Sequence, residues 1–329
     1  MSPTIVGGKV GRIGYGLLGL SWRPTIPSEE QAFAAMHAAL ETGCNLWNGG
    51  VFYGPLENNS LVLLNKYYTK YPEDAEKVVL NVKGGLRDMT PDGSPEFLRQ
   101  EIDNALKQLG GKGRIDMYEC ARRDPNTPLK TTLETLAELV KEGKIGGVAL
   151  SEVNADTIKE AASITKIVAV EVELSLWSTD PLTNGIAKVC HELGIPIIAY
   201  SPIGHGMLTG QIKSYKDIPE GDIRQKLPRF QPENFEVNMK LVKELEHIAK
   251  KKNCTPAQLA LGWHVSLSKR PGMPEIIPIP GATTVERVKE NAGAVELTDE
   301  EMGEIKGILD SCEIIGDRYH AMGMKMVNG

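Results

Sequence analysis

Polar side chains that can exchange protons follow two strand-like runs of the 329-residue chain. Tyr53 comes shortly after the run at 44–48, and Lys83 ends the apolar run at 77–83. A phenol and an ammonium group can both donate a proton, and a nearby ammonium makes a phenol easier to ionise. Each residue also has an ordinary interpretation, because Tyr53 precedes a glycine turn and a lysine at a strand end is commonly solvated. The pair becomes a candidate acid–base site only if the fold brings the two strand ends together.

Strand-like and helix-like segments alternate along the chain. The expected strands lie near residue 16 and at 44–48, 77–83, 115–120, 146–151, 167–174, 195–201 and 275–279. Apolar spacing and capping residues predict helices at 28–42, 56–68, 94–110, 127–142, 154–163, 180–194, 233–251, 255–267 and 284–293. The length alone would allow two domains, but about eight βα units leave little room for a second one. We therefore expect an α/β fold, a single-domain (β/α)₈ TIM barrel spanning 1–329, whose chemistry lies after the strands.

A doubly wound sheet is the competing fold, and it would place GxGxxG between its first strand and a helix. Gly14, Gly16 and Gly19 match that spacing. However, Pro24 and Pro27 follow closely and are incompatible with a helix interior there. The sequence instead predicts a glycine-rich strand and loop at the barrel mouth.

Composition excludes several classes of partner. Lys and Arg number 37 and Asp and Glu 43, so the net charge is −6, and no dense basic run suggests a nucleic-acid partner. No apolar run approaches the roughly 18 residues of a membrane helix, and the N-terminus does not read as a signal peptide. Five scattered cysteines and six histidines lack metal-ligand spacing, so we expect no metal and a cytoplasmic protein with reduced thiols.

Six ordered segments resemble those of the aldo-keto reductase family over nearly the whole chain. They are GCNLWNGGVFYG (43–54), KVVLNVK (77–83), IDMYECARRDPNTP (115–128), AYSPIGHGMLTG (199–210), LPRFQPENF (227–235) and IIPIPGATTVERVKEN (276–291). The resemblance implies a (β/α)₈ barrel, usually monomeric, that transfers a hydride reversibly between NADPH/NADP+ and a small-molecule aldehyde or other carbonyl. It implies that Tyr53 donates the proton and that Lys83 supplies the charge beside it.

Two positions depart from the family pattern. The aspartate that pairs with the catalytic lysine aligns with Asn48, so we expect Asn48 to bond to Lys83 while the ammonium loses its usual counter-charge. The histidine that faces the substrate oxygen aligns with Ala121. We hypothesise that Arg122 or Arg123 approaches the oxygen instead; alternatively, both arginines face nearby aspartates or solvent.

The resemblance also assigns the cofactor contacts. Tyr200 would stack on the nicotinamide. Ser151 and Glu171 would hold its carboxamide, with Glu171 standing where the family has glutamine. Other segments would contact the rest of NADPH: Ser201, Ile203, Gly204 and Gly206 the pyrophosphate, Gly281, Thr283 and Arg287 the 2′-phosphate, and Glu290 and Asn291 the adenine. The stretch 202–232 would be the cofactor-covering loop. Arg287 is the reason to favour NADPH over NADH.

Within the family, the two departures and the surrounding NGG and ARRDP look like the pyridoxal reductases, which implies reduction of pyridoxal to pyridoxine. The sequence leaves two alternatives open: a broad aldehyde reductase, and an NADPH-sensing regulatory subunit with little turnover. Trp22, Trp47 and Trp177 could line the mouth and stack on a flat aldehyde, although tryptophans at strand ends more often pack in the core or at the rim. The C-terminal tail, 311–329, could fold over the mouth or be disordered.

Overall fold

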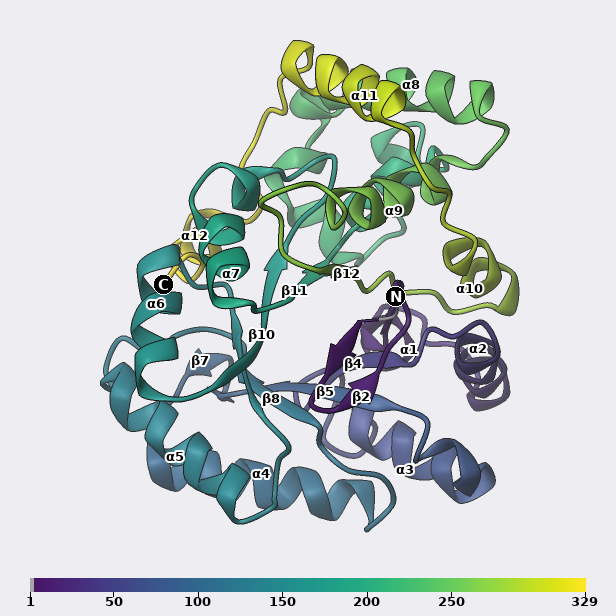
Figure 1. The fold of residues 1–329 in the computed structure, drawn as a ribbon. Coiled ribbons are helices and arrows are strands. Elements are labelled where there is room, and N and C mark those ends of the chain that lie inside the picture. The colour runs from purple at the N-terminus through teal and green to yellow at the C-terminus, as the bar shows by residue number, and fades with distance from the viewer. Residues whose placement is uncertain (1–2) are drawn as a thin grey trace.

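Eight parallel strands form a barrel surrounded by helices in the computed structural model, which describes residues 3–329 (Figure 1). The strands are β3 (Tyr15–Gly16), β4 (Leu46–Gly50), β5 (Val79–Gly84), β8 (Met117–Cys120), β9 (Val148–Ser151), β10 (Ile167–Glu173), β11 (Ile197–Tyr200) and β12 (Ile276–Pro278). Each strand pairs with the next in this order. A parallel bridge between Gly16 and Gly281 joins the first strand to the segment after the last. The N–H groups of Gly14 and Gly16 donate across this seam to the carbonyls of Pro278 and Pro280. The expected single-domain (β/α)₈ barrel is confirmed.

Helices occupy the connections between the strands. They are α1 (Leu18–Ser21), α2 (Glu29–Glu41), α3 (Ser60–Lys70), α4 (Pro95–Leu109), α5 (Leu129–Lys141), α6 (Ala155–Ile164), α7 (Ile186–Leu193), α8 (Pro232–Lys251), α9 (Pro256–Leu267), α10 (Val285–Ala292), α11 (Asp299–Ser311) and α12 (Ala321–Met324). Within residues 3–329, no helix combines the length and apolarity that a membrane crossing requires.

Two expected helices have different bounds in the structure, and three observed helices, α1, α11 and α12, were not predicted. The helix expected at 56–68 begins only at Ser60, because the Asn59 side chain caps it by accepting from the N–H groups of Leu61 and Val62. The segment 180–194 is split into a 3₁₀ turn and α7. Helix α11 was not expected, although a capping box between Thr298 and Glu301 starts it.

The barrel interior has an apolar floor and a polar upper layer. Side chains two residues apart on a strand face the same side, so each strand contributes to both layers. The floor is formed by Leu46, Val79, Met117, Ala149, Ala169, Ile198 and Ile277, which pack against Ile5 and Val10 near the hairpin of β1 (Thr4–Ile5) and β2 (Gly8–Lys9). Two positions further along their strands come Asn48, Asn81, Glu119, Ser151 and Glu171. The polar groups therefore collect toward the carboxyl ends of the strands.

Two of the three tryptophans considered for the mouth are buried, which agrees with the alternative of core or rim packing. Trp47 is fully buried and packs edge-on against Tyr15. Trp177 is buried against Phe230. Only Trp22 is exposed, 44% of its surface being accessible. Trp47 and Trp177 therefore pack against other aromatic side chains in the core and do not line a pocket.

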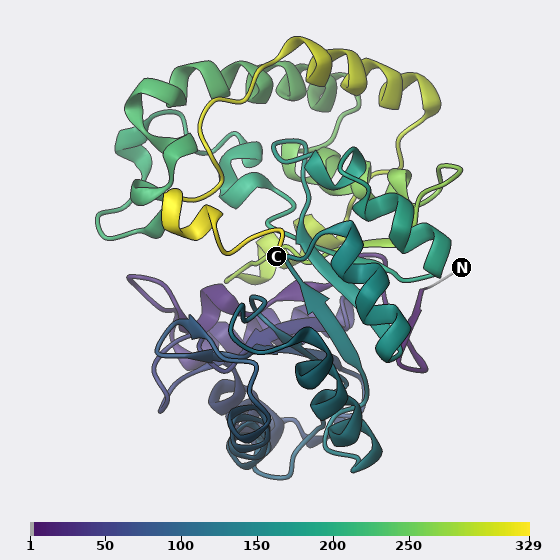
Figure 2. The ribbon, with the colours of Figure 1, turned by 90° about the vertical axis from the view of Figure 1, so that its left-hand side faces the viewer.

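The tail 311–329 packs against the barrel through hydrogen bonds (Figure 2). After α11, the Ile315 N–H donates to Oδ1 of Asn238 on α8. At its end, the Gly329 N–H donates to the carbonyl of Glu152, and the Asn154 N–H donates to the carbonyl of Gly329. The tail thus runs from α8 to the end of β9, and of the two alternatives the folded one is correct.

Candidate active site

A buried ion-pair cluster centres on Lys83, near the carboxyl end of β5. Lys83 lies in register with Glu119 on the neighbouring strand β8, so both side chains enter the barrel at the same level. The Lys83 Nζ donates to Glu119 Oε1 at 2.7 Å and, across the barrel, to Glu171 Oε1 on β10 at 2.6 Å. It also lies 3.4 Å from the Ser151 hydroxyl. All three charged side chains are at most 5% exposed.

The expectation that this ammonium lacks a counter-charge was therefore wrong. Asn48 does not bond to Lys83 in the structure; its Nδ2 donates to Glu171 Oε2 at 2.7 Å. The Asn81 amide donates to the same oxygen at 3.0 Å. Glu171 was expected to contact the cofactor, and its observed partners are the lysine and these two amides. The carboxylate that Lys83 requires is supplied by β10 instead of β4.

Electrostatics in this cluster favour a charged lysine and a neutral tyrosine. Burial by itself would lower the pKa of Lys83, but the carboxyl groups of Glu119 and Glu171 raise it above its usual value. Burial raises the pKa of Tyr53, and the Lys83 charge offsets part of that rise. At neutral pH Tyr53 therefore carries the proton that a donor must have, beside a permanent ammonium.

The Tyr53 ring lies just beyond the end of β4, packed closely against the backbone of Gly50. A Cβ at Gly50 would lie 2.9 Å from Cγ of Tyr53, so the ring packs where only glycine leaves room. The Tyr53 carbonyl accepts from the Ser21 hydroxyl at 2.6 Å. On the outer side, the Trp22 ring lies 6.1 Å from the Tyr53 ring, centre to centre. These contacts hold the phenol at the mouth beside an exposed aromatic surface.

The structure separates the two arginines that follow β8. Arg122 is half-buried, and its guanidinium lies 6.0 Å from the centre of the Tyr319 ring. Its Nη1 donates to the carbonyl of Ala121 at 2.5 Å. Arg123 is exposed and lies 3.4 Å from the Thr157 hydroxyl on α6. Only Arg122 is therefore near the groups at the mouth.

Two residues of the tail complete the mouth. Arg318 forms a bidentate ion pair with Glu152: its Nη2 donates to Oε2 at 2.8 Å and its Nη1 to Oε1 at 3.1 Å. The same Nη1 lies 3.3 Å from Oε2 of Glu173. Its charge holds the pKa of Glu152 below the usual range although burial acts in the opposite direction. The Tyr319 hydroxyl lies 2.9 Å from that of Tyr200, the residue expected beneath the nicotinamide.

The residues expected at the adenosine end cluster around the seam and α10. Gly281 pairs with Gly16 across the seam, and the Thr283 carbonyl accepts from the Gln31 side chain. Arg287 is exposed in the first turn of α10 and donates to Gln211 Oε1 at 2.8 Å. Gln211 lies within the 202–232 loop, so this loop contacts Arg287. The remaining predicted residues of this region are Ser201, Ile203, Gly204, Gly206, Glu290 and Asn291, in the loop and on α10.

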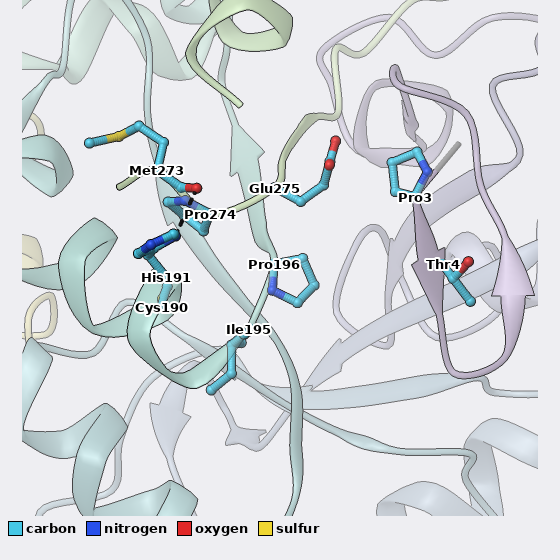
Figure 3. A pocket seen from close by; sticks show the side chains of 10 residues that line it. Pro3, Thr4, Cys190, His191, Ile195, Pro196, Met273, Pro274 and Glu275 are labelled. Atoms are coloured by element: carbon cyan, nitrogen blue, oxygen red, sulfur yellow. Dashed lines mark hydrogen bonds between the residues drawn. The ribbon is translucent and has the colours of Figure 1, made fainter. Parts of the chain in front are cut away.

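Two hollows lie at the opposite end of the barrel. One, of about 280 Å³, is lined by residues preceding β11 and β12, among them His191, Pro196 and Glu275 (Figure 3). The His191 Nδ1 lies 3.1 Å from the Met273 carbonyl there. The other, of about 430 Å³, is lined by residues preceding β3 and β4. Neither contains a member of the Lys83 cluster.

Four residues of the site were not assigned from the sequence: Asn81, Glu119, Arg318 and Tyr319. The first two had a detectable signal, because each is a polar residue in an otherwise apolar strand. Polar groups inside a barrel strand require partners, and those partners come from other strands. Arg318 and Tyr319 lie in the C-terminal tail, where nothing in the local sequence indicates which part of the barrel the tail contacts.

Comparisons with known proteins show the family to which the chain belongs. The model of the Aldo/keto reductase family matches residues 12–310. A protein of Schizosaccharomyces pombe named "Probable pyridoxal reductase 2" is 43% identical, covering 97% of both chains. A protein of Saccharomyces cerevisiae named "Putative pyridoxal reductase" is 41% identical, covering 93% of this chain and 95% of its own.

Solved structures agree on the fold. A glycerol dehydrogenase from Gluconobacter oxydans superposes with a TM-score of 0.82 at 21% identity, covering 96% of both chains. A thermostable aldo-keto reductase gives a TM-score of 0.72 at 23% identity, covering 94% of this chain and 99% of its own. With the family model matching most of its length, the chain belongs to the aldo/keto reductase family.

Proposed function

We propose that this protein is an NADPH-dependent carbonyl reductase that converts pyridoxal, an aldehyde, into the primary alcohol pyridoxine. The proposal is carried by the placement of Tyr53 at the mouth, against Gly50, within electrostatic reach of the Lys83 ammonium that Glu119 and Glu171 hold by hydrogen bonds. Support for the substrate comes from the two relatives named as pyridoxal reductases. Support for the cofactor comes from a Schizosaccharomyces pombe relative, 36% identical, named "Aldo-keto reductase yakc [NADP(+)]".

The donor groups around α10 and the 202–232 loop fit NADPH. Arg287 has no carboxylate within ion-pair distance among residues 3–329, so its guanidinium is available to a phosphate. It stands at the N-terminal turn of a helix, where anions are favoured. Gly204 and Gly206 take positive φ values of 57° and 91°, which lets the loop backbone turn tightly. We expect these residues to hold the 2′-phosphate and pyrophosphate.

The proposed mechanism assigns one task to each residue at the mouth. NADPH, when bound, supplies the hydride for the aldehyde carbon. Tyr53 donates its phenolic proton to the aldehyde oxygen as negative charge develops there. The Lys83 ammonium stabilises the phenolate that remains. Arg122 adds positive charge on the side where the family has histidine, which favours the developing alkoxide.

The arrangement also favours turnover over a purely regulatory role. A sensor of NADPH would need only the cofactor contacts. Here Lys83 is held by two carboxyl groups and its charge acts on Tyr53. Burying three ionisable groups together is costly, and a protein that only binds nucleotide gains nothing from it.

The test is NADPH oxidation with pyridoxal by the wild type and by Tyr53→Phe. We expect the wild type to oxidise NADPH and to prefer pyridoxal over benzaldehyde in kcat/KM. Tyr53→Phe should lose roughly 10²- to 10⁴-fold in kcat while its Kd for NADPH stays within about twofold. Equal kcat/KM for the two aldehydes would favour the broad reductase. NADPH that binds but is oxidised by none of the aldehydes would favour the regulatory subunit.

A further inference from the structure

Glu119 gives Lys83 a second carboxyl group, and no role in the proposed mechanism requires it. One ammonium needs one carboxylate for charge balance, yet Lys83 donates to both Glu119 and Glu171. Glu119 is completely buried and Glu171 is 1% exposed. If both were ionised, the barrel would hold an unbalanced negative charge away from water, which is strongly unfavourable. One of the two carboxyl groups must therefore be neutral or find another cation.

Hydrogen bonding shows which carboxyl group carries the charge. Glu171 accepts three N–H bonds, from Lys83, Asn48 and Asn81. Glu119 accepts one, from Lys83, and its Oε2 has no partner. Donors stabilise the ionised form, so Glu171 is the carboxylate.

A second buried atom points to the same assignment. Among the buried side-chain oxygens that the structure describes, only two lack a partner: Glu119 Oε2 and Asn81 Oδ1. They come from adjacent strands, β8 and β5, and both are acceptors when Glu119 is ionised. A proton on Glu119 would convert one of these two acceptors into a donor. Burial and the neighbouring Glu171 also raise the pKa of Glu119 well above its usual value.

We propose that Glu119 is a positioning residue that, as a neutral carboxylic acid, holds the Lys83 ammonium near Tyr53 without adding charge to the site. This role rests on the proposed reductase function. The ionisable groups that face Glu119 are Lys83 on β5, Glu171 on β10 and Tyr53 after β4, whereas Cys120, the next residue on its own strand, points to the other side of the sheet. An ionised Glu119 would make the cluster negative and oppose phenolate formation at Tyr53. The neutral acid fixes Lys83 while leaving its charge balanced by Glu171 alone.

Infrared difference spectroscopy tests the protonation directly, without substrate or cofactor. At pH 7 the wild type should show the carbonyl stretch of a protonated carboxyl group that disappears in Glu119→Gln. The matched control is Glu160→Gln, the same substitution at an exposed side chain, which should leave that band in place. Any band from Glu101, a half-buried carboxyl group, is common to all three proteins and cancels. No loss of a band in Glu119→Gln would overturn the proposal.

Kinetics test the positioning role. Glu119→Ala removes one of the two carboxyl acceptors of Lys83, so we expect kcat to fall roughly tenfold or more while the Kd for NADPH stays within about twofold. Glu119→Gln keeps a neutral acceptor and should recover most of that loss. Equal kcat in the Gln and Ala variants would contradict the positioning role, and if the Ala variant does not fold, the infrared result and the Gln variant still decide. If the wild type does not reduce pyridoxal, the proposed function is contradicted. The infrared result on the protonation of Glu119 does not depend on that outcome.

Discussion

Asn48 Nδ2 and Glu171 Oε2 lie 2.7 Å apart, joined by a hydrogen bond across the barrel interior. The resemblance implies aspartate at position 48 and glutamine at position 171. This chain has the acid and the amide exchanged, and the two side chains are hydrogen-bonded to each other. The exchange moves the counter-charge of Lys83 from β4 to β10 and leaves the number of charges at the pair unchanged.

This exchange predicts non-additive mutations. Glu171→Gln should lower kcat about tenfold, because Lys83 loses its principal counter-charge, and Asn48→Asp alone should destabilise the fold by adding a buried carboxylate. The double variant Asn48→Asp with Glu171→Gln restores the family arrangement, so it should be more active than Glu171→Gln alone. A double-mutant cycle on kcat and on the free energy of unfolding measures the coupling. Strictly additive effects would show that the two side chains act independently.

Arg122 and Arg123 provide a matched pair for testing the group that replaces histidine. Arg122→Ala should lower kcat roughly 10²-fold, because the half-buried guanidinium no longer favours the developing alkoxide. Arg123→Ala should change kcat by less than about twofold, since Arg123 is exposed and directed at α6. Steady-state kinetics with pyridoxal give both values. Unchanged kcat in both variants would remove arginine from the mechanism.

Arg287 should determine the preference for NADPH over NADH. Arg287→Ala removes a charged donor worth about 1.5–3 kcal/mol to a phosphate, so the Kd for NADPH should rise roughly tenfold or more. The Kd for NADH, which lacks the 2′-phosphate, should change little. Lys289→Ala, an exposed cation on the same helix, is the control for net charge. Fluorescence titration of both cofactors measures the shift, and equal losses for NADPH and NADH would argue against a 2′-phosphate contact.

The ion pair between Arg318 and Glu152 should make stability depend on pH. Arg318 lowers the pKa of Glu152, so the pair stabilises the fold above the unfolded pKa near 4.3, and this contribution is lost as pH falls through the folded value. Arg318→Met should cost about 3 kcal/mol at pH 7, because it leaves a buried carboxylate unpaired. The difference from the wild type should shrink in acid.

Urea unfolding at several pH values measures this difference. The control is Arg99→Met, which breaks the more exposed ion pairs of Arg99 with Glu138 and Glu142 and should cost less than about 1 kcal/mol. A loss for Arg318→Met that is equally small, or independent of pH, would show that the tail is not held by this pair.

The sequence was sufficient for the barrel and for the strand ends that carry Tyr53 and Lys83, because apolar periodicity is a local property. It was not sufficient for the partners of Lys83. Glu119 and Glu171 reach it through strand register and across the barrel, which depend on closure of the whole sheet. The burial of Trp47 could not be predicted for a related reason. An aromatic side chain on a barrel strand can point outward, beneath a helix, as easily as into the barrel.

The seam between β3 and the segment after β12 links barrel closure to cofactor binding. It is held by one parallel bridge, the N–H groups of Gly14 and Gly16, and the Tyr15 hydroxyl, which donates to the Ala282 carbonyl at 2.7 Å, whereas β4 and β5 pair over five positions. The sheet should therefore open more easily here than between β4 and β5, and amide hydrogen exchange should be faster at these glycines than in those two strands. Gly281 and Thr283, expected to contact the 2′-phosphate, lie on the same seam. A ligand that bridges them to the rest of the barrel would suppress that opening by mass action, so NADPH would tighten the seam as well as supply the hydride.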